Sequence, residues 1–169
     1  MKNEGRTQPA YVGDERELAL AFLAFHRDTL HWKIDGLTKE QLLQPVPPST
    51  MTLLGLVRHL AVVEDSWFNE IFLGEGLSEP WASVDWDADR DWEWHSAADY
   101  SVQESIALWE TAVARSNAVI AAHGFDERSA KGTDRPSLRW IVLHMIEEYS
   151  RHNGHADLLR EAVDGQTGR

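Results

Sequence analysis

Apolar residues recur every three or four positions in four separate stretches of the chain, which is the spacing of one face of an α-helix. In the most regular stretch the spacings alternate between four and three, as in helices that pack in a bundle. Its packing face consists of Leu138, Val142, Met145, Tyr149, His152, Ala156, Leu159 and Val163. No stretch shows the sustained alternation of a β-strand. The pattern therefore predicts an all-α protein.

Residues that cap helices bound the four stretches. Asp14 with Glu17, and Ser101 with Glu104, have the spacing of a capping box at a helix N-terminus. Glycines that can end a helix follow the stretches at positions 36, 74, 124 and 165. We therefore expect four helices, over residues 14–36, 52–73, 101–123 and 137–164.

The connection between the second and third expected helices, residues 75–100, is the longest. Its length permits these two helices to run parallel while the connector crosses the bundle. We predict a four-helix bundle with a long crossover between helices two and three, in which residues 1–169 form one domain. Four tryptophans of the connector stand among acidic residues, and we expect their indoles to cover the bundle rather than project into water. They are Trp81, Trp86, Trp92 and Trp94.

The charge balance limits the classes of partner. With 28 acidic and 16 basic residues the formal net charge is −12, which opposes binding to nucleic acid or to an anionic membrane. No apolar run approaches the ~20 residues of a membrane span, and Met1 to Ala10 lack the apolar core of a signal peptide. We therefore expect a cytoplasmic protein. Because the chain has no cysteine, thiol chemistry would need an external thiol.

Three side chains on two of the expected helices suggest a metal site. Glu148 and His152 are four residues apart, so they lie on one helix face, and His59 lies near the packing face of the second helix. Three nitrogen and oxygen ligands would leave a coordination position open, as in catalytic sites. The alternative is a Glu148–His152 pair that only satisfies itself inside the bundle, because a buried imidazole needs a partner.

Further titratable groups lie on the same face of the last helix. His144, Glu148, His152 and His155 follow one another at steps of four, four and three. Burying four such groups together is costly without a metal or water to organise them. This arrangement favours the metal site over the self-satisfied pair.

Other charged residues are more weakly informative. Arg58 and Glu64, on the second helix, could contact the site or form a solvated salt bridge. The acidic run over residues 85–93 lacks the ligand spacing and central glycine of a calcium-binding loop. We interpret it as a solvated loop.

The segments around these residues resemble a known family. Residues 49–60 and 63–64 resemble the second-helix motif of the DinB-like superfamily. Residues 138–161 resemble the last helix of its branch related to mycothiol-dependent maleylpyruvate isomerases and mycothiol S-transferases, and residues 14–16 and 37–42 resemble the first helix and its exit. The resemblance covers most of the chain outside the tryptophan-rich connector. It implies a four-helix bundle with a long crossover.

The resemblance also implies a divalent metal, zinc or nickel, held by a histidine of helix two and two residues of the last helix. Many members have two histidines there, whereas the mycothiol-linked branch has Glu then His, which matches His59, Glu148 and His152. His144 and His155 are then flanking residues that line the pocket or relay a proton. The isomerases carry an additional C-terminal domain, while this sequence ends at Arg169, so a transferase is expected rather than an isomerase.

The expected function is metal-dependent S-transfer, in which a low-molecular-weight thiol such as mycothiol attacks a small electrophile. Metal coordination would lower the thiol pKa and produce the thiolate. Two alternatives stay open. One is a hydrolase that uses a metal-activated water, and the other is a non-enzymatic bundle that binds metal or dimerises. The eight tryptophans could supply a homodimer interface, because Trp is enriched at interfaces.

Overall fold

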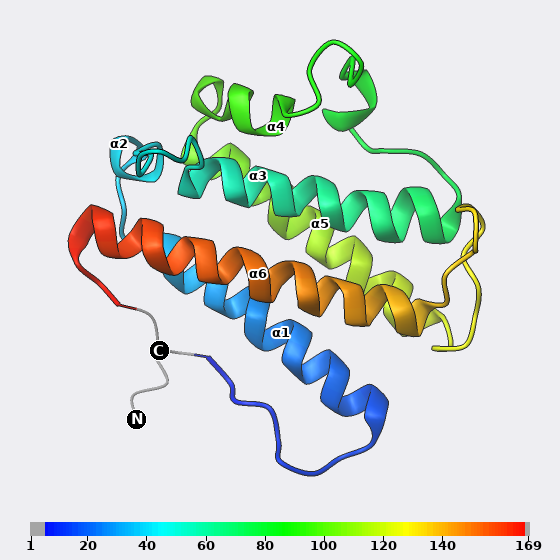
Figure 1. Ribbon diagram of the computed structural model, residues 1–169. Helices are drawn as coiled ribbons and strands as arrows, with labels where there is room; N and C mark the ends of the chain where they lie inside the picture. The colour runs from blue at the N-terminus through cyan, green and yellow to red at the C-terminus, as the bar shows by residue number, and fades with distance from the viewer. Residues whose placement is uncertain (1–5, 168–169) are drawn as a thin grey trace.

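The computed structural model describes residues 6–167, and over this range the protein is all-helical (Figure 1). The α-helices within it are α1 (Glu15–Ile34), α2 (Lys39–Leu42), α3 (Leu53–Glu64), α4 (Trp92–His95), α5 (Val102–Ala122) and α6 (Leu138–Asp164). A π-helix, η1 (Asp65–Leu73), continues α3, and two 3₁₀-helices, η2 (Trp81–Ser83) and η3 (Ser96–Asp99), flank α4. The predicted all-α class is confirmed.

With α3 and η1 taken together, the long helices begin and end within two residues of their predicted positions, because the caps form as the sequence indicates. At α1, Asp14 accepts a hydrogen bond from the Glu17 amide, and the Glu17 carboxylate accepts one from the Asp14 amide. The same reciprocal pair begins α5. Gly74 and Gly165, both at φ +77°, end η1 and α6 in the left-handed conformation that glycine adopts without strain.

The second expected helix changes its hydrogen-bond pattern partway along. Residues 53–64 are α-helical, whereas η1 has the wider i→i+5 pattern of a π-helix. Apolar spacing alone does not distinguish the two forms over so short a stretch. Because π-helical turns are rare and frequently occur at functional sites, η1 is a candidate functional segment.

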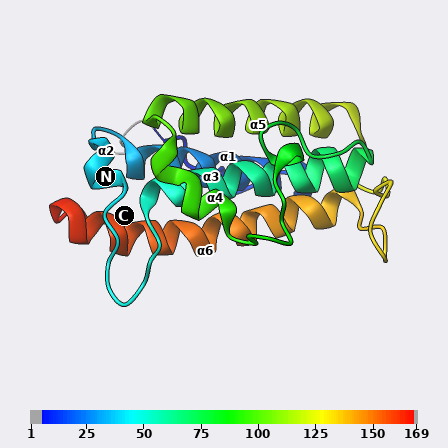
Figure 2. The same cartoon turned by 90° about the horizontal axis from the view of Figure 1, so that it is seen from above.

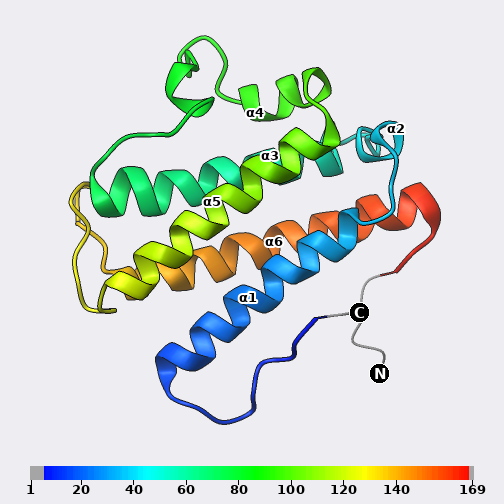
Figure 3. The ribbon, with the colours of Figure 1, turned by 180° about the vertical axis from the view of Figure 1, so that it is seen from behind.

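The four long helices pack chiefly in two pairs, α1 with α6 and α3 with α5, and α3 also lies against α6. In Figures 1 and 3, α3 and α5 run in the same direction, opposite to α1 and α6. Every residue of the predicted packing face of α6 except Val163 is buried. A fully buried Leu or Met contributes about 1.5–3 kcal/mol, so this face anchors the core. Among residues 6–167, no helix combines the length and apolar composition that crossing a membrane requires.

The tryptophan-rich connector lies along the outer side of α3, and Figure 2 shows α4 resting on that helix. Trp81 is buried, and Trp86, Trp92 and Trp94 pack half-buried against the core. The prediction that these indoles cover the helices is therefore confirmed. The connector also carries the short helix α4, which was not expected.

Arg58 of α3 anchors this connector. Its side chain is fully buried and donates hydrogen bonds to the Glu93 carbonyl at 3.2 Å and to Ser96 Oγ at 3.1 Å. The guanidinium lies 3.9 Å from the centre of the Tyr100 ring, a cation–π contact. Burial lowers the pKa of Arg58. Arg58 is thus buried and has no salt-bridge partner among residues 6–167, and it holds α4 against α3.

A saturated polar network crosses the centre of the molecule. Arg27 Nε and Nη2 donate to the two carboxylate oxygens of Glu64 at 2.7 Å, and Arg27 Nη1 donates to Asn117 at 2.9 Å. Tyr149 donates to Glu64 at 2.8 Å and accepts from Trp109 Nε1 at 2.8 Å. The network joins α1, α3, α5 and α6. Glu64 is therefore in a buried ion pair rather than a solvated salt bridge.

Candidate metal centre

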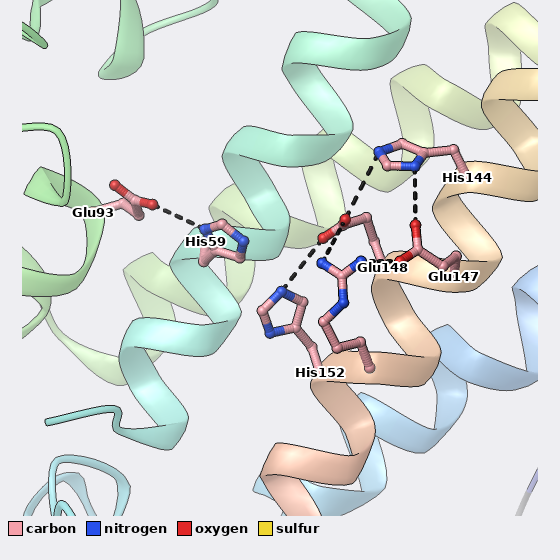
Figure 4. Close-up of polar contacts among 7 residues, drawn as sticks. His59, Glu93, His144, Glu147, Glu148 and His152 are labelled. Atoms are coloured by element: carbon pink, nitrogen blue, oxygen red, sulfur yellow. Dashed lines mark hydrogen bonds and ion pairs between the residues drawn. The ribbon is translucent and has the colours of Figure 1, made fainter. Parts of the chain in front are cut away.

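His59 from α3 and Glu148 and His152 from α6 converge where these helices face each other. One donor atom from each side chain lies within 4.8 Å of the other two. His152 Nε2 is 3.4 Å from Glu148 Oε2, and the ring centroids of His59 and His152 are 4.7 Å apart. Figure 4 shows the three side chains pointing toward one another across the gap between the helices. The three ligands expected from the sequence are thus brought together.

The cluster lies at the edge of the core. His152 and Glu148 belong to the buried face of α6, and their side chains are only 9% and 11% exposed. The His59 side chain is 23% exposed. Because a small exposed portion remains on His59, the cluster is accessible from the α3 side while most of its polar surface is removed from water.

Glu93 of α4 supports His59 from the other side. Its Oε1 accepts a hydrogen bond from His59 Nδ1 at 2.9 Å, and the Glu93 side chain is 6% exposed. In Figure 4 the second ring nitrogen of His59 points toward Glu148 and His152. Metal-binding histidines commonly donate their other N–H to a carboxylate, which fixes the tautomer and the ring orientation. The interpretation of residues 85–93 as solvated loop is therefore wrong for Glu93.

Trp94, the next residue of α4, forms an aromatic wall over the cluster. Its ring stacks on His59 with centroids 5.1 Å apart and an interplanar angle of 28°, and it lies 6.5 Å from the His152 ring. Gly55 permits this approach, because a Cβ atom at position 55 would lie 2.6 Å from Trp94 Cε3. The short helix α4 thus supplies both a hydrogen-bond acceptor and a hydrophobic cover.

The flanking histidines lie beside the three candidate ligands. His144 Nε2 is 3.7 Å from Glu148 Oε1, and His144 Nδ1 is 3.1 Å from Glu147 Oε2. These three residues form a second group with metal-ligand spacing that shares Glu148. Burial lowers the pKa of His144. The His155 ring lies 5.4 Å from the His152 ring, on the far side from His144.

Two buried imidazole nitrogens without partners, and the lowered pKa of His152, bear on whether a metal ion fits the cluster. Within residues 6–167, His152 Nδ1 and His155 Nδ1 are buried without a hydrogen-bond partner, which costs about 1–3 kcal/mol per group. Pairing with Glu148 therefore does not satisfy His152. Burial, followed by the charges of His59 and His155, lowers the pKa of His152 to about 4. The imidazole is then neutral near pH 7, the form that binds metal.

The donor set and its surroundings also fit a divalent ion. Two imidazoles and one carboxylate, without sulfur, suit zinc or nickel. Arg151 Nη1 donates to Glu148 Oε1 at 3.0 Å, and this contact helps to orient the carboxylate. Sequence reasoning found the three candidate ligands but missed Glu93 and Trp94. No local pattern marks either one, because their roles depend on how the connector folds back onto α3.

Comparison with known proteins adds one finding. A family model described as Mycothiol-S-transferase matches residues 18–165. The matched range contains all four long helices except the first residues of α1, and it includes His59, Glu148 and His152. No curated protein matches the chain.

Proposed function

The chain belongs to the mycothiol-S-transferase family, and from this premise we propose that it is a metal-dependent S-transferase that joins a low-molecular-weight thiol of the mycothiol type to a small electrophile. The observation that carries the proposal is the convergence of His59, Glu148 and His152 on one point. We further propose that the long helices form the DinB-like four-helix bundle, with residues 75–100 as its crossover. In that arrangement the ligand-bearing helices α3 and α6 face each other across the core.

His59, Glu148 and His152 would hold the metal, with zinc or nickel as the proposed ion. When bound, the metal would supply Lewis acidity that lowers the pKa of a thiol at the open position. Glu93 fixes the His59 ring through the 2.9 Å bond to Nδ1, and Arg151 orients Glu148 through its 3.0 Å bond. These contacts keep the ligands preorganised before either substrate arrives.

His155 and His144 are the proposed proton carriers. His155 Nδ1 is buried, unpartnered within residues 6–167 and adjacent to His152, so it is suited to accept the thiol proton in the tautomer protonated on Nε2. His144 is 21% exposed and lies between Glu147 and Glu148, where it can pass a proton between the cluster and solvent. Both groups act without coordinating the ion.

The proposed S-transfer reaction needs neither an oxidant nor a reductant. The thiol loses its proton to a histidine, and its sulfur forms a bond to an electrophilic carbon. The leaving group departs with the electron pair of the broken bond. For an activated alkene nothing leaves, and the proton returns to the carbon next to the new bond. Trp94 stacks on His59 and shields part of the cluster from water, which favours the thiol over hydrolysis.

A turnover assay with and without thiol tests the proposal. We expect the zinc- or nickel-loaded protein to consume electrophile only when thiol is supplied, and His59→Ala or His152→Ala to abolish that activity. The matched control is His95→Ala, which removes an exposed histidine of the same connector and should leave activity unchanged. Hydrolysis without thiol would favour the metal-activated-water alternative. Stoichiometric metal without any turnover would favour a metal-binding module.

A further inference from the structure

A cavity of about 510 Å³ lies between η1 and the start of α6. Trp67 and Ile71 line it from η1, Pro136 and Trp140 from the α6 side, and Arg128 with residues 132–134 close it. Pockets for small molecules typically measure about 300–1,000 Å³ and are mostly apolar with a few polar groups. In size and lining, this cavity matches that class.

Two indoles form its main walls. The ring centroids of Trp67 and Trp140 are 5.3 Å apart with an interplanar angle of 52°, and Trp140 is 48% exposed. Exposure of a large aromatic side chain at a cavity leaves a π face available to a ligand. The rim carries Arg128 and Asp134, whose opposite charges offset each other. The lining therefore suits an uncharged planar molecule.

The same indoles contact the metal centre through His144. The His144 ring lies 4.6 Å from Trp67 and 5.0 Å from Trp140, where it stacks at 17°. On its other side, His144 Nε2 is 3.7 Å from Glu148 Oε1. One imidazole thus separates the cavity from the candidate ligands. Three other cavities each have α5 residues in their lining, and none of the three is lined by His144, Trp67 or Trp140.

The loop that closes the cavity is fixed to η1. The amides of Ala130 and Lys131 donate to the carbonyls of Phe72 and Ile71 at 2.8 and 3.0 Å. Arg135, in the same loop, has φ +46°, a conformation that residues other than glycine adopt at a cost of ~1–3 kcal/mol. Strained backbone and π-helix both occur preferentially at functional sites, and here they border one cavity.

We propose that this cavity binds the uncharged, planar aromatic part of the electrophile, with its reactive carbon directed past His144 toward the metal centre. The reaction rests on the proposed transferase function, whereas binding in the cavity does not. This separation allows the two proposals to fail independently.

Binding is tested with 1,3-dinitrobenzene, which has the planar ring but no leaving group. The probe is titrated into the purified protein without thiol, and the indole N–H signals of the eight tryptophans are followed by nitrogen-15 NMR. We expect the Trp67 and Trp140 signals to shift and the Trp109 signal, from an α5 cavity, to stay. Trp140→Leu should weaken binding about tenfold, while Leu143→Ala, an exposed apolar position on the same helix, should not. Shifts at Trp109 alone, or none, overturn the proposal.

Turnover separates this proposal from the transferase function. With thiol and metal present, Trp140→Leu should raise KM for 1-chloro-2,4-dinitrobenzene about tenfold with little change in kcat. The value of kcat/KM for iodoacetamide, which has no ring, should stay within about twofold. Equal losses for both electrophiles, or none, contradict the cavity assignment. If this protein binds dinitrobenzene but has no transferase activity, the result contradicts the proposed function and still supports the cavity as an aromatic-binding site.

Discussion

Two buried polar clusters lie within a few residues of each other on α3 and α6, and they differ in how completely they are satisfied. In the central network, the interacting atoms of Arg27, Glu64 and Tyr149 all have partners. In the candidate metal centre, buried imidazole nitrogens have no partner within residues 6–167. Tyr149 of the first cluster directly follows Glu148 of the second in the sequence.

This difference indicates that the central network has a structural role and that the candidate metal centre has a functional one. A saturated network gains nothing from a ligand and serves to align the four long helices. A cluster of two imidazoles and a carboxylate that face one another is stabilised when an ion binds between them. Substitutions in the first cluster should therefore change folding, and substitutions in the second should change metal binding.

Glu64→Ala should have the largest effect. It leaves the Arg27 guanidinium buried without its carboxylate, and breaking a buried ion pair in this way costs about 3–5 kcal/mol. The measurement is the free energy of unfolding in urea without metal. As a control, replacing both partners, Arg27→Met with Glu64→Leu, should recover much of the loss. A stable Glu64→Ala variant that no longer binds metal would reverse the assignment of the two clusters.

His59→Ala should remove metal-dependent stabilisation. A metal at 100 times its dissociation constant raises the free energy of unfolding by ~2.7 kcal/mol. We expect this increase for the wild-type protein and none for the variant. Thermal or urea unfolding with and without zinc measures the increase in each protein. Equal stabilisation of the two proteins by zinc would place the ion elsewhere.

Glu93→Gln should have an intermediate effect, confined to metal affinity. Loss of a carboxylate behind a metal-bound histidine typically weakens binding about 10–100-fold, whereas glutamine keeps the size and an acceptor oxygen for His59 Nδ1. Competition with a chelator gives the dissociation constant. Unchanged affinity together with a loss of stability would show that Glu93 serves only to attach the connector.

Asp89→Asn should have the smallest effect. The exposed pair Asp89–His95 resembles Glu93–His59 in geometry, with an Nδ1–carboxylate distance of 2.9 Å, but it faces solvent. The hydrogen bond from Asp89, and then its charge, raise the pKa of His95. The small stabilisation that this pair gives the folded protein is therefore present while His95 is protonated, and it disappears as the pH rises through that pKa. In the variant the pKa should fall in an NMR titration while metal affinity stays the same. Lower metal affinity would contradict the assignment of Glu93–His59, and not Asp89–His95, to the metal centre.

Local sequence predicted the features that depend on local contacts. The capping boxes at Asp14 and Ser101 form as expected, and the regular face of α6 is buried, with His152 at a core position. The positions of Glu148 and His152 on one helix face follow from their spacing alone. These features depend on hydrogen bonds and periodicity within one helix, which a sequence displays directly.

Features that depend on contacts between distant segments were not predictable in the same way. Glu93 stands in an acidic run that has the composition of a solvated loop, and its burial results from the contact with His59, 34 residues away. Glu64 gives no local sign of its pairing with Arg27. The cover provided by Trp94 requires Gly55 on another helix. In each case the partner is set by how the connector and helices pack.

X-ray absorption at the zinc edge, recorded on the zinc-loaded protein before and after addition of a low-molecular-weight thiol, shows whether the thiol binds the metal. We expect one zinc per chain with only nitrogen and oxygen ligands at first, since the chain has no cysteine. After addition of thiol, one sulfur ligand should appear at about 2.3 Å, and His152→Ala should lose the stoichiometric zinc. An unchanged nitrogen and oxygen shell in the presence of thiol, or zinc retained by His152→Ala, would rule out a thiol-binding metal held by these three residues.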